Sequence, residues 1–330
     1  MKILITGGGG FLGRRLARKL LERNRLKGTD GHDHPIEQLI LLDIQPVEGF
    51  TDARVHVAHG DIGDPQLLHR VIDPEVQAIF HLAAIVSAQA EADFDLGMRI
   101  NVDASRSLLE VCRAAGHRPK IVFTSSVAVF GGKLPETVLD STAVFPQSSY
   151  GAEKAIVELL ISDYSRRGFV DGRVVRLPTI SVRPGRPNKA ASSFASGIIR
   201  EPLNGEESIC PVGADIRLWL LSPRKAIDNL IAAQELSAES LADGRVINVP
   251  GVCVRVSEMV AALERVAGAA AAEHIVWQRD PSIERIVGSW PGAWDTTRAV
   301  KLGLRGDPDF ETIIRNYMED DLPRAKASAR

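Results

Sequence analysis

Tyr150 and Lys154 stand four residues apart in a segment with a helical pattern, and this spacing suits proton transfer. Residues at i and i+4 lie on one face of an α-helix, about one turn apart. A free phenol, with a pKa of about 10, is a poor base at neutral pH, but a nearby ammonium favours the phenolate. We therefore expect Lys154 to lower the pKa of Tyr150, so that the tyrosine can take the proton of an alcohol whose carbon loses hydride. Because a surface helix can carry the same two residues by chance, the assignment depends on the rest of the chain.

A run of glycines separates the first predicted strand from the first predicted helix. Lys2–Thr6 is a short apolar run typical of a buried parallel strand, and residues 14–23 have a helical pattern. Glycines between a strand and a helix let backbone N–H groups approach a pyrophosphate, and the helix N-terminus adds a favourable partial charge. The context predicts a dinucleotide-binding loop with G-x-x-G-x-x-G spacing. The predicted contacts from this loop are Gly7, Gly10, Phe11, Leu12 and Gly13.

The second predicted strand, Gln38–Asp43, ends in an acid. Asp43 can accept hydrogen bonds from the adenosine ribose hydroxyls and repel a 2′-phosphate, which favours NAD over NADP. The interval from the glycine loop to Asp43 is longer than usual, and we attribute the excess to a polar insertion loop at residues 24–37. The alternative is that Asp43 only starts a turn. His32 and His34 lie in the insertion without other potential ligands nearby, so we predict a solvated loop and no metal site.

Further apolar runs alternate with helical segments, which predicts an α/β fold with a parallel sheet. Long helices are expected over residues 93–115 and 148–160. Hydroxyl residues end the strand that precedes the Tyr150 helix, at the edge where ligands bind in open parallel sheets. A ligand bound at this edge would therefore lie close to the hydroxyls of Thr124, Ser125 and Ser126. The further predicted strands are Arg54–Ala58, Ala78–Ala84, Lys120–Ser126, Gly172–Leu177 and Arg245–Val249.

Bulk composition excludes several classes of protein. With 330 residues, the chain is long enough for two interlocked lobes. Its formal net charge of -2 provides no basic surplus for nucleic acid or an anionic membrane. Its three cysteines are scattered, which favours a reducing compartment over a disulfide framework. The sequence has no uninterrupted apolar run of about 18 residues, so we expect a cytoplasmic protein.

Six segments in chain order resemble the extended short-chain dehydrogenase/reductases, which include the NAD-dependent epimerases and dehydratases of nucleotide sugars. The resemblance covers essentially the whole chain. It implies a doubly wound Rossmann domain with a smaller C-terminal α/β substrate lobe, and a homodimer formed through the Tyr150 helix. The segments are the glycine loop, Gly60-Asp61-Ile62, Leu82-Ala83-Ala84, Asn101-Val102, Thr124-Ser125-Ser126 and Tyr150-x-x-x-Lys154.

The same resemblance implies roles for individual residues. Ser126 is expected to hydrogen-bond the reacting oxygen, Tyr150 to act as acid and base, and Lys154 to hold the nicotinamide ribose. Ser125 is the rival for the role given to Ser126. NAD is the expected cofactor, with the domain that binds it at residues 1–180 and the substrate lobe mainly at 181–330. Residues around 215–250 are expected to return to the first domain. Beyond the glycine loop, Asp43, Tyr150 and Lys154, the expected cofactor contacts are Asp61, Ile62, Leu82, Ala83, Ala84, Asn101, Thr124 and Pro178.

The segments after the sixth predicted strand depart from the pattern of nucleotide-sugar enzymes. They read R-L-P-T-I at residues 176–180 and R-L-W-L-L-S-P at 217–223, whereas such enzymes carry different segments there. A basic loop with Arg183 and Arg186 would suit a small polyhydroxylated carboxylate, because arginine binds carboxylates through a planar fork. The alternative is that both arginines belong to a solvated turn. The expected substrate contacts are Ser126, Thr179, Arg183, Asn188, Ser192 and Ser193.

Four stretches, including 126–132 and 176–188, resemble a bacterial group within this family that oxidises a four-carbon sugar acid at C2 with NAD. The resemblance implies the same reaction here, with Tyr150 as the base. One alternative is a nucleotide-sugar 4-epimerase that holds NAD tightly. Another is a non-catalytic NAD sensor, which the intact Tyr150 and Lys154 disfavour.

Overall fold

A seven-stranded parallel sheet forms the centre of the N-terminal lobe in the computed structural model, which describes residues 1–187, 190–241 and 244–322. The strand order is β12-β8-β7-β6-β1-β4-β5, and every pairing within it is parallel. The order reverses at β1, as in doubly wound sheets, which confirms the predicted fold class. The strands are β1 (Lys2–Thr6), β4 (Gln38–Asp43), β5 (Val55–His59), β6 (Val76–His81), β7 (Lys120–Ser126), β8 (Asp171–Leu177) and β12 (Val246–Asn248).

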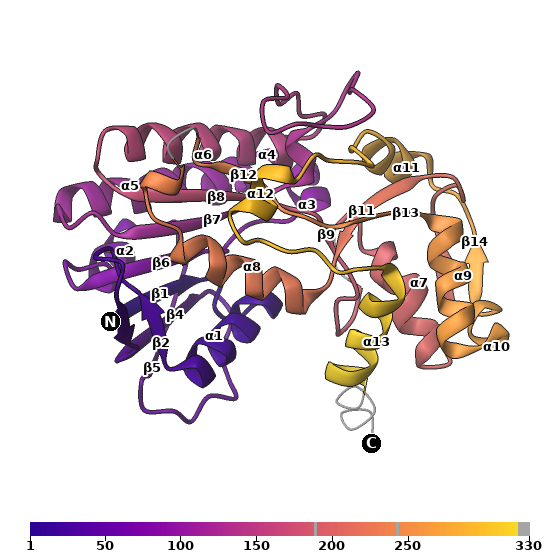
Figure 1. Ribbon diagram of the computed structural model, residues 1–330, viewed down its shortest axis with the longest axis horizontal. Coiled ribbons are helices and arrows are strands. Elements are labelled where there is room, and N and C mark those ends of the chain that lie inside the picture. The colour runs from indigo at the N-terminus through magenta and orange to yellow at the C-terminus, as the bar shows by residue number, and fades with distance from the viewer. Residues whose placement is uncertain (188–189, 242–243, 323–330) are drawn as a thin grey trace.

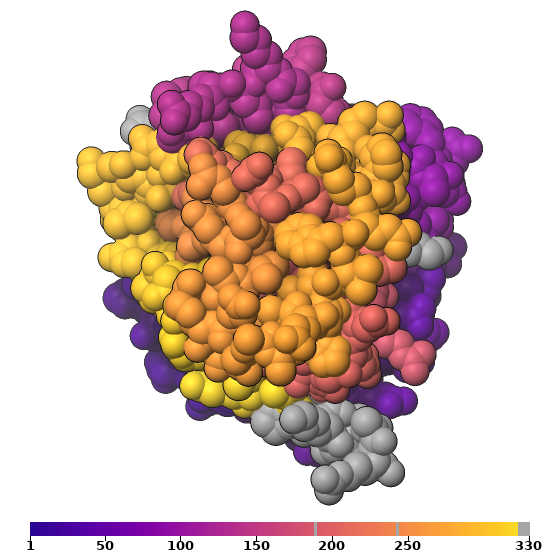
Figure 2. All heavy atoms as spheres, turned by 90° about the vertical axis from the view of Figure 1, so that its right-hand side faces the viewer, coloured from indigo at the N-terminus to yellow at the C-terminus, as the bar shows by residue number. Residues whose placement is uncertain are grey.

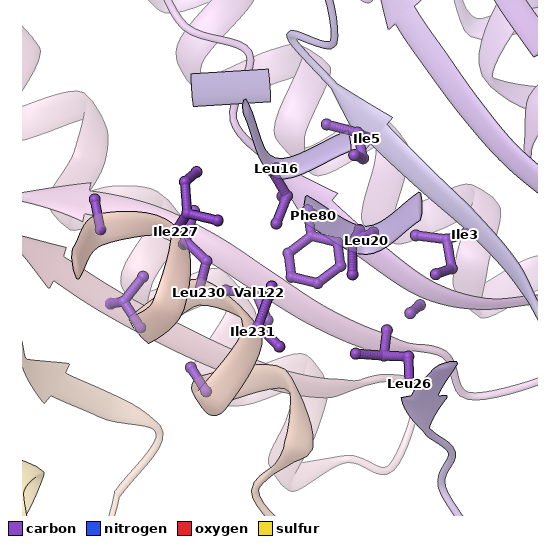
Figure 3. Packing of buried hydrophobic residues seen from close by; sticks show 14 of the residues in the cluster. Ile3, Ile5, Leu16, Leu20, Leu26, Phe80, Val122, Ile227, Leu230 and Ile231 are labelled. Atoms are coloured by element: carbon purple, nitrogen blue, oxygen red, sulfur yellow. The ribbon is translucent and has the colours of Figure 1, made fainter. Parts of the chain in front are cut away.

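Helices cover both faces of this sheet, because alternate residues of each buried strand point to opposite sides. On one face, Ile3 and Ile5 pack against α1 (Phe11–Arg23) and α8 (Pro223–Glu235), a cluster shown in Figure 3. On the other face, Leu4 packs with apolar side chains of three further helices. These are α2 (Pro65–Val71), α5 (Ala104–Ala115) and α6 (Ser149–Arg166).

Two predicted elements differ from the structure. The predicted insertion loop contains a hairpin, β2 (Arg25–Lys27) paired with β3 (Asp33–Pro35), because Leu26 and Ile36 are buried in the core. The helix predicted over residues 93–115 is interrupted by a π-helical turn, η1 (Met98–Asp103). It is therefore a series of α4 (Phe94–Gly97), η1 and α5, preceded by α3 (Ser87–Ala92).

The C-terminal lobe lies at the right of Figure 1 and faces the viewer in Figure 2. It contains a three-stranded sheet, β13-β11-β9, and a parallel pair, β10-β14, around an apolar cluster of its own. Its strands are β9 (Thr179–Ile180), β10 (Ser208–Cys210), β11 (Arg217–Leu221), β13 (Val252–Arg255) and β14 (Ile275–Trp277). Its helices are α7 (Phe194–Leu203), α9 (Val256–Ala267), α10 (Ala269–Ala272), α11 (Pro281–Gly288) and α13 (Phe310–Asp320).

Later segments return to the N-terminal lobe. Helix α8 packs against its sheet, and β12 forms one edge of that sheet, with α12 (Thr297–Lys301) beside it. Strand β11, by contrast, belongs to the small sheet of the C-terminal lobe. Two short 3-10 turns, η2 (Val127–Val129) and η3 (Glu239–Leu241), complete the described elements. The division into lobes after Ile180 stays a prediction. None of the helices in the described ranges is both long enough and apolar enough to span a bilayer.

Candidate active site

The glycine loop after β1 is too tightly packed for side chains. A Cβ on Gly13 would lie 2.2 Å from the Gly7 carbonyl oxygen, and one on Gly7 would lie 2.9 Å from the backbone nitrogen of Ala83. Gly7 also has a φ of +70°, a conformation that favours glycine. Gly10 precedes α1 and provides no side-chain cap for its N-terminus. The first-turn N–H groups therefore suit an anionic ligand, which fits a pyrophosphate.

Two cavities meet at this loop and share Gly7, Gly10, Leu82 and Ala84 in their walls. One has a volume of about 290 Å³ and extends toward the C-terminal lobe. The other, of about 270 Å³, extends toward the carboxyl ends of β4 and β5. A pair of cavities on either side of a pyrophosphate loop matches the two halves of a dinucleotide, so the residues present fit NAD. The second cavity is lined by Asp43, Asp61, Ile62, Ala83, Leu96, Arg99 and others.

Two carboxylates, Asp43 and Asp61, line the second cavity. Asp43 Oδ2 accepts a hydrogen bond of 2.9 Å from the Gly9 N–H, which fixes the carboxylate next to the glycine loop. Asp61 accepts hydrogen bonds of 2.7 Å from the Gly63 N–H and from Arg99 Nη1. Burial alone would raise the pKa of Asp61, but the hydrogen bonds from Arg99 and Gly63 hold it below its usual value. Both predicted acids therefore line the cavity expected to receive the adenosine half.

Tyr150 and Ser126 meet in the first cavity. Tyr150 is in the first turn of α6, which Ser148 caps by accepting a hydrogen bond from the Gly151 N–H at 3.2 Å. Ser126 ends β7, and its hydroxyl acts to lower the pKa of Tyr150. The rival Ser125 instead donates to the buried carboxylate of Glu158. The geometry thus favours Ser126 over Ser125 as the serine that would hydrogen-bond the reacting oxygen.

Glu158 belongs to a buried network behind the cavity. Arg176 donates to both its carboxylate oxygens, through Nε at 2.9 Å to Oε1 and through Nη2 at 2.7 Å to Oε2. The guanidinium carbon also lies 4.7 Å from the centroid of the Phe130 ring. These contacts occupy the Ser125 hydroxyl and anchor β7, β8 and α6 to one another.

The electrostatics of the Tyr150–Lys154 pair correct the sequence prediction. Lys154 Nζ is buried and donates to the Thr124 carbonyl oxygen at 3.0 Å. Burial lowers the pKa of Lys154 to about 8, against the opposing charges of Glu153 and Glu158. Burial raises the pKa of Tyr150 to about 12, while Ser126 and the charge of Arg183 act to lower it. The predicted lowering by Lys154 is wrong for this structure because desolvation of the phenolate outweighs nearby positive charge.

Two polar residues near the cleft have structural contacts. His81, at the end of β6, is buried between the Thr6 and Ser105 hydroxyls, at 2.7 and 2.9 Å. Burial, followed by the charge of Lys154, lowers the pKa of His81 to about 3, so the ring is neutral. Asn101, a predicted cofactor contact, is absent from the walls of both described cavities. Its amide instead bonds the backbone of Ile85, at 2.8 and 3.0 Å, and supports the loop after β6.

Arg183 reaches the first cavity from the C-terminal lobe. It is half-buried, and among the described residues its side chain has one hydrogen bond, to the Ser192 hydroxyl at 3.4 Å, and no carboxylate partner. Burial lowers the pKa of Arg183 to about 10, and the charge of Arg200 acts in the same direction. Arg200 Nη1 donates to the Arg183 carbonyl oxygen at 2.7 Å and holds the segment in place. A guanidinium in this setting is a site for an anionic group.

The other predicted residues divide into three groups. Residues lining the first cavity are Gly13, Phe11, Leu12, Thr124, Pro178, Thr179 and Ser192. Ser193, the residue before α7, and the exposed Arg186 do not line it. Asn188 lies outside the described residues.

Sequence reasoning missed Trp290, which lines the first cavity from the segment after α11, and Arg99, which pairs with Asp61. No local pattern marks either residue, because each acquires its neighbour only through tertiary contacts.

A sequence model of the NAD dependent epimerase/dehydratase family matches residues 3–224. The chain belongs to this family. Membership confirms the predicted resemblance and NAD as the cofactor.

Individual members of the NAD dependent epimerase/dehydratase family are similar over nearly their full length. D-erythronate dehydrogenase from Cupriavidus necator is 59% identical over 97% of this chain and 98% of its own. D-erythronate dehydrogenase from Haemophilus influenzae is 50% identical over 98% of this chain and 100% of its own. The crystal structure of the nucleoside-diphosphate-sugar epimerase from Agrobacterium tumefaciens superposes with a TM-score of 0.91 at 41% identity, covering 98% of this chain and 95% of that one.

Proposed function

We propose that this protein is an NAD-dependent dehydrogenase that oxidises D-erythronate to 2-oxo-D-erythronate. The observation that carries the proposal is the half-buried Arg183, which lines the same cavity as Tyr150 and has no carboxylate partner among the described residues. An arginine there would bind the carboxylate of a small sugar acid and bring the adjacent C2 hydroxyl to the tyrosine. The similarity to two D-erythronate dehydrogenases supports the same substrate.

In the proposed mechanism, Arg183 and Ser192 hold the substrate carboxylate, and Thr179 lies in the adjoining wall. The C2 hydroxyl is bound between the Ser126 and Tyr150 hydroxyls, and Tyr150 accepts its proton. Lys154, whose Nζ lies 5.6 Å from the centroid of the Tyr150 ring, would hold a ribose of the cofactor and supply positive charge next to the tyrosine. When bound, NAD supplies the hydride acceptor. The residues of the chain thus orient the substrate alcohol, accept its hydroxyl proton and bind the negative charge of the substrate carboxylate.

The test mixes purified protein and NAD with a panel of four-carbon and five-carbon aldonic acids and follows the absorbance of NADH. We expect rapid reduction with D-erythronate and little with NADP. Silence across the panel would contradict the proposal. If UDP-sugars were then interconverted without net formation of NADH, a nucleotide-sugar 4-epimerase would replace it.

Asp43 is proposed to select NAD over NADP. Asp43→Asn keeps an acceptor for the Gly9 N–H but removes the negative charge that would repel a 2′-phosphate. We expect the ratio of kcat/KM for NAD to that for NADP to fall about 10-fold to 100-fold. Asp64→Asn is the matched control, because Asp64 caps α2 outside both cavities and asparagine caps equally well. An unchanged ratio in Asp43→Asn would exclude this role.

We also propose a homodimer formed through α6. Leu159 is 69% exposed and Ile156 39% exposed on this helix, and Phe94 of α4 is 59% exposed. A twofold interface would bury these apolar side chains against the same surface of a second copy. We expect analytical ultracentrifugation to find a dimer for the wild type and a monomer for Leu159→Glu. Val300→Glu, a similar change at an exposed position of α12, should remain dimeric. A monomeric wild type would contradict the proposal.

A further inference from the structure

Glu153 is a carboxyl group buried beside the Tyr150–Lys154 pair, and the proposed reaction does not use it. It is 1% exposed and directly precedes Lys154 on α6. Its Oε2 accepts a hydrogen bond of 2.6 Å from Asn101 Nδ2. Its Oε1 is buried and has no hydrogen-bond partner within the described part of the chain. A buried carboxylate oxygen without a partner is costly, so its presence at this position calls for a function.

The neighbours of Glu153 connect α6 to the wall of the second cavity, which contains Asp43. The carboxyl group packs against α4, where a Cβ on Gly97 would lie 2.3 Å from Oε1. Asn101, which donates to the carboxyl group, also bonds the N–H and the carbonyl oxygen of Ile85. Ile85 lines the cavity that holds Asp43 and follows the cleft-lining segment Leu82–Ala84. A continuous series of hydrogen bonds therefore runs from Glu153 of α6, through Asn101, to Ile85 in the loop after β6.

Charges around Glu153 show how it acts on its neighbours. Burial raises the pKa of the Glu153 carboxyl, against the Asn101 hydrogen bond and the charge of Lys154. The charge of Glu91 in α3 also raises the pKa of Glu153. The neighbours of the carboxyl group in α4 and η1 are uncharged: Gly97 in α4 and the side-chain amide of Asn101 in η1. The negative charge of Glu153 raises the pKa of both Tyr150 and Lys154. Ionised Glu153 thus opposes deprotonation of both members of the pair.

We propose that Glu153 is a positioning residue of the active site. Through Asn101 it connects α6, which carries Tyr150 and Lys154, to the loop after β6 that lines the second cavity. Its negative charge sets the pH range of the reaction. It acts through its neighbours, without contact to the substrate. The inference rests on the proposed function in one respect, because it takes Tyr150 and Lys154 as the acid/base pair.

The experiment compares three substitutions of Glu153 by two measurements. Glu153→Gln removes the charge but keeps a carbonyl acceptor for Asn101, Glu153→Asp keeps the charge, and Glu153→Ala removes both. The first measurement is the pH profile of kcat with NAD and D-erythronate. The second, which needs no turnover, is the phenolate absorbance of Tyr150 during a pH titration. Since the chain has three tyrosines, subtraction of a Tyr150→Phe background isolates this one.

In Glu153→Gln we expect both limbs of the profile, and the phenolate midpoint, to move to lower pH by about one unit. Loss of a neighbouring negative charge favours both the phenolate and the neutral amine, which fixes the direction of the shift. Glu153→Asp should keep the wild-type pH range. Glu153→Ala should shift like Glu153→Gln and also weaken NAD binding, because Asn101 loses its partner. Glu91→Gln is the matched control and should shift neither curve, because Glu91 is exposed and screened by water.

Unshifted curves in Glu153→Gln would overturn the proposal, and so would equal shifts in Glu153→Gln and Glu153→Asp, since charge would then not be the cause. Failure of the proposed function has a different signature. In that case the wild type would not oxidise D-erythronate, while the phenolate midpoint would still move in Glu153→Gln.

Discussion

Tyr150→Phe is expected to reduce kcat with D-erythronate by about 10²-fold to 10⁴-fold, the usual contribution of a positioned acid or base. The substitution removes one hydroxyl from a cavity whose other walls stay in place, so the affinity for NAD should change little. Steady-state kinetics measure the first effect, and quenching of protein fluorescence by NAD measures the second. Tyr164→Phe is the matched control on the same helix, because the Tyr164 hydroxyl binds Glu110 outside the cavity. A variant at Tyr150 that kept wild-type kcat would rule out its role as base.

The pKa of Tyr150 predicts how kcat should depend on pH. With a pKa of about 12, the phenol is protonated at neutral pH, and only its ionised form can accept the alcohol proton. The fraction of phenolate increases as pH increases toward that pKa. The kcat for oxidation should therefore increase with pH above neutrality, and this increase should be absent in Tyr150→Phe.

Arg183→Gln is expected to raise the KM for D-erythronate by about 10²-fold, because the half-buried guanidinium is proposed to bind the substrate carboxylate. NAD affinity should be unchanged. Arg183→Lys keeps the charge without the planar fork, so its KM should lie between those of the wild type and Arg183→Gln. Steady-state kinetics across the three proteins provide the measurement.

Two controls identify the cause of that effect. Arg186→Gln removes an exposed arginine three residues away, outside the walls of the cavity, and should leave the KM unchanged. The neutral amide of erythronate should be a poor substrate for the wild type, with no further loss in Arg183→Gln. If Arg183→Gln impaired the amide and the acid equally, Arg183 would act by shaping the cavity and not by binding charge.

The sequence alone was enough to predict the architecture and the central chemistry. Buried strands appear as short apolar runs, and a glycine loop between a strand and a helix has a local backbone requirement. The bounds predicted for β1, β4 and β7 are those observed. The pairing of Tyr150 with Lys154 follows from helical periodicity alone. Family membership, confirmed by comparison, then identifies the cofactor.

Tertiary structure decided which of these residues meet and how they titrate. Ser125 and Ser126 are adjacent in sequence, but successive strand residues point to opposite faces, so one meets Glu158 and the other Tyr150. The pKa of Tyr150 rises instead of falling because burial depends on elements distant in the chain. The same holds for Glu153, which a sequence shows only as one more charged residue of a helix. Periodicity determines which side chains share a face, whereas desolvation and hydrogen-bond partners depend on what the folded chain packs against that face.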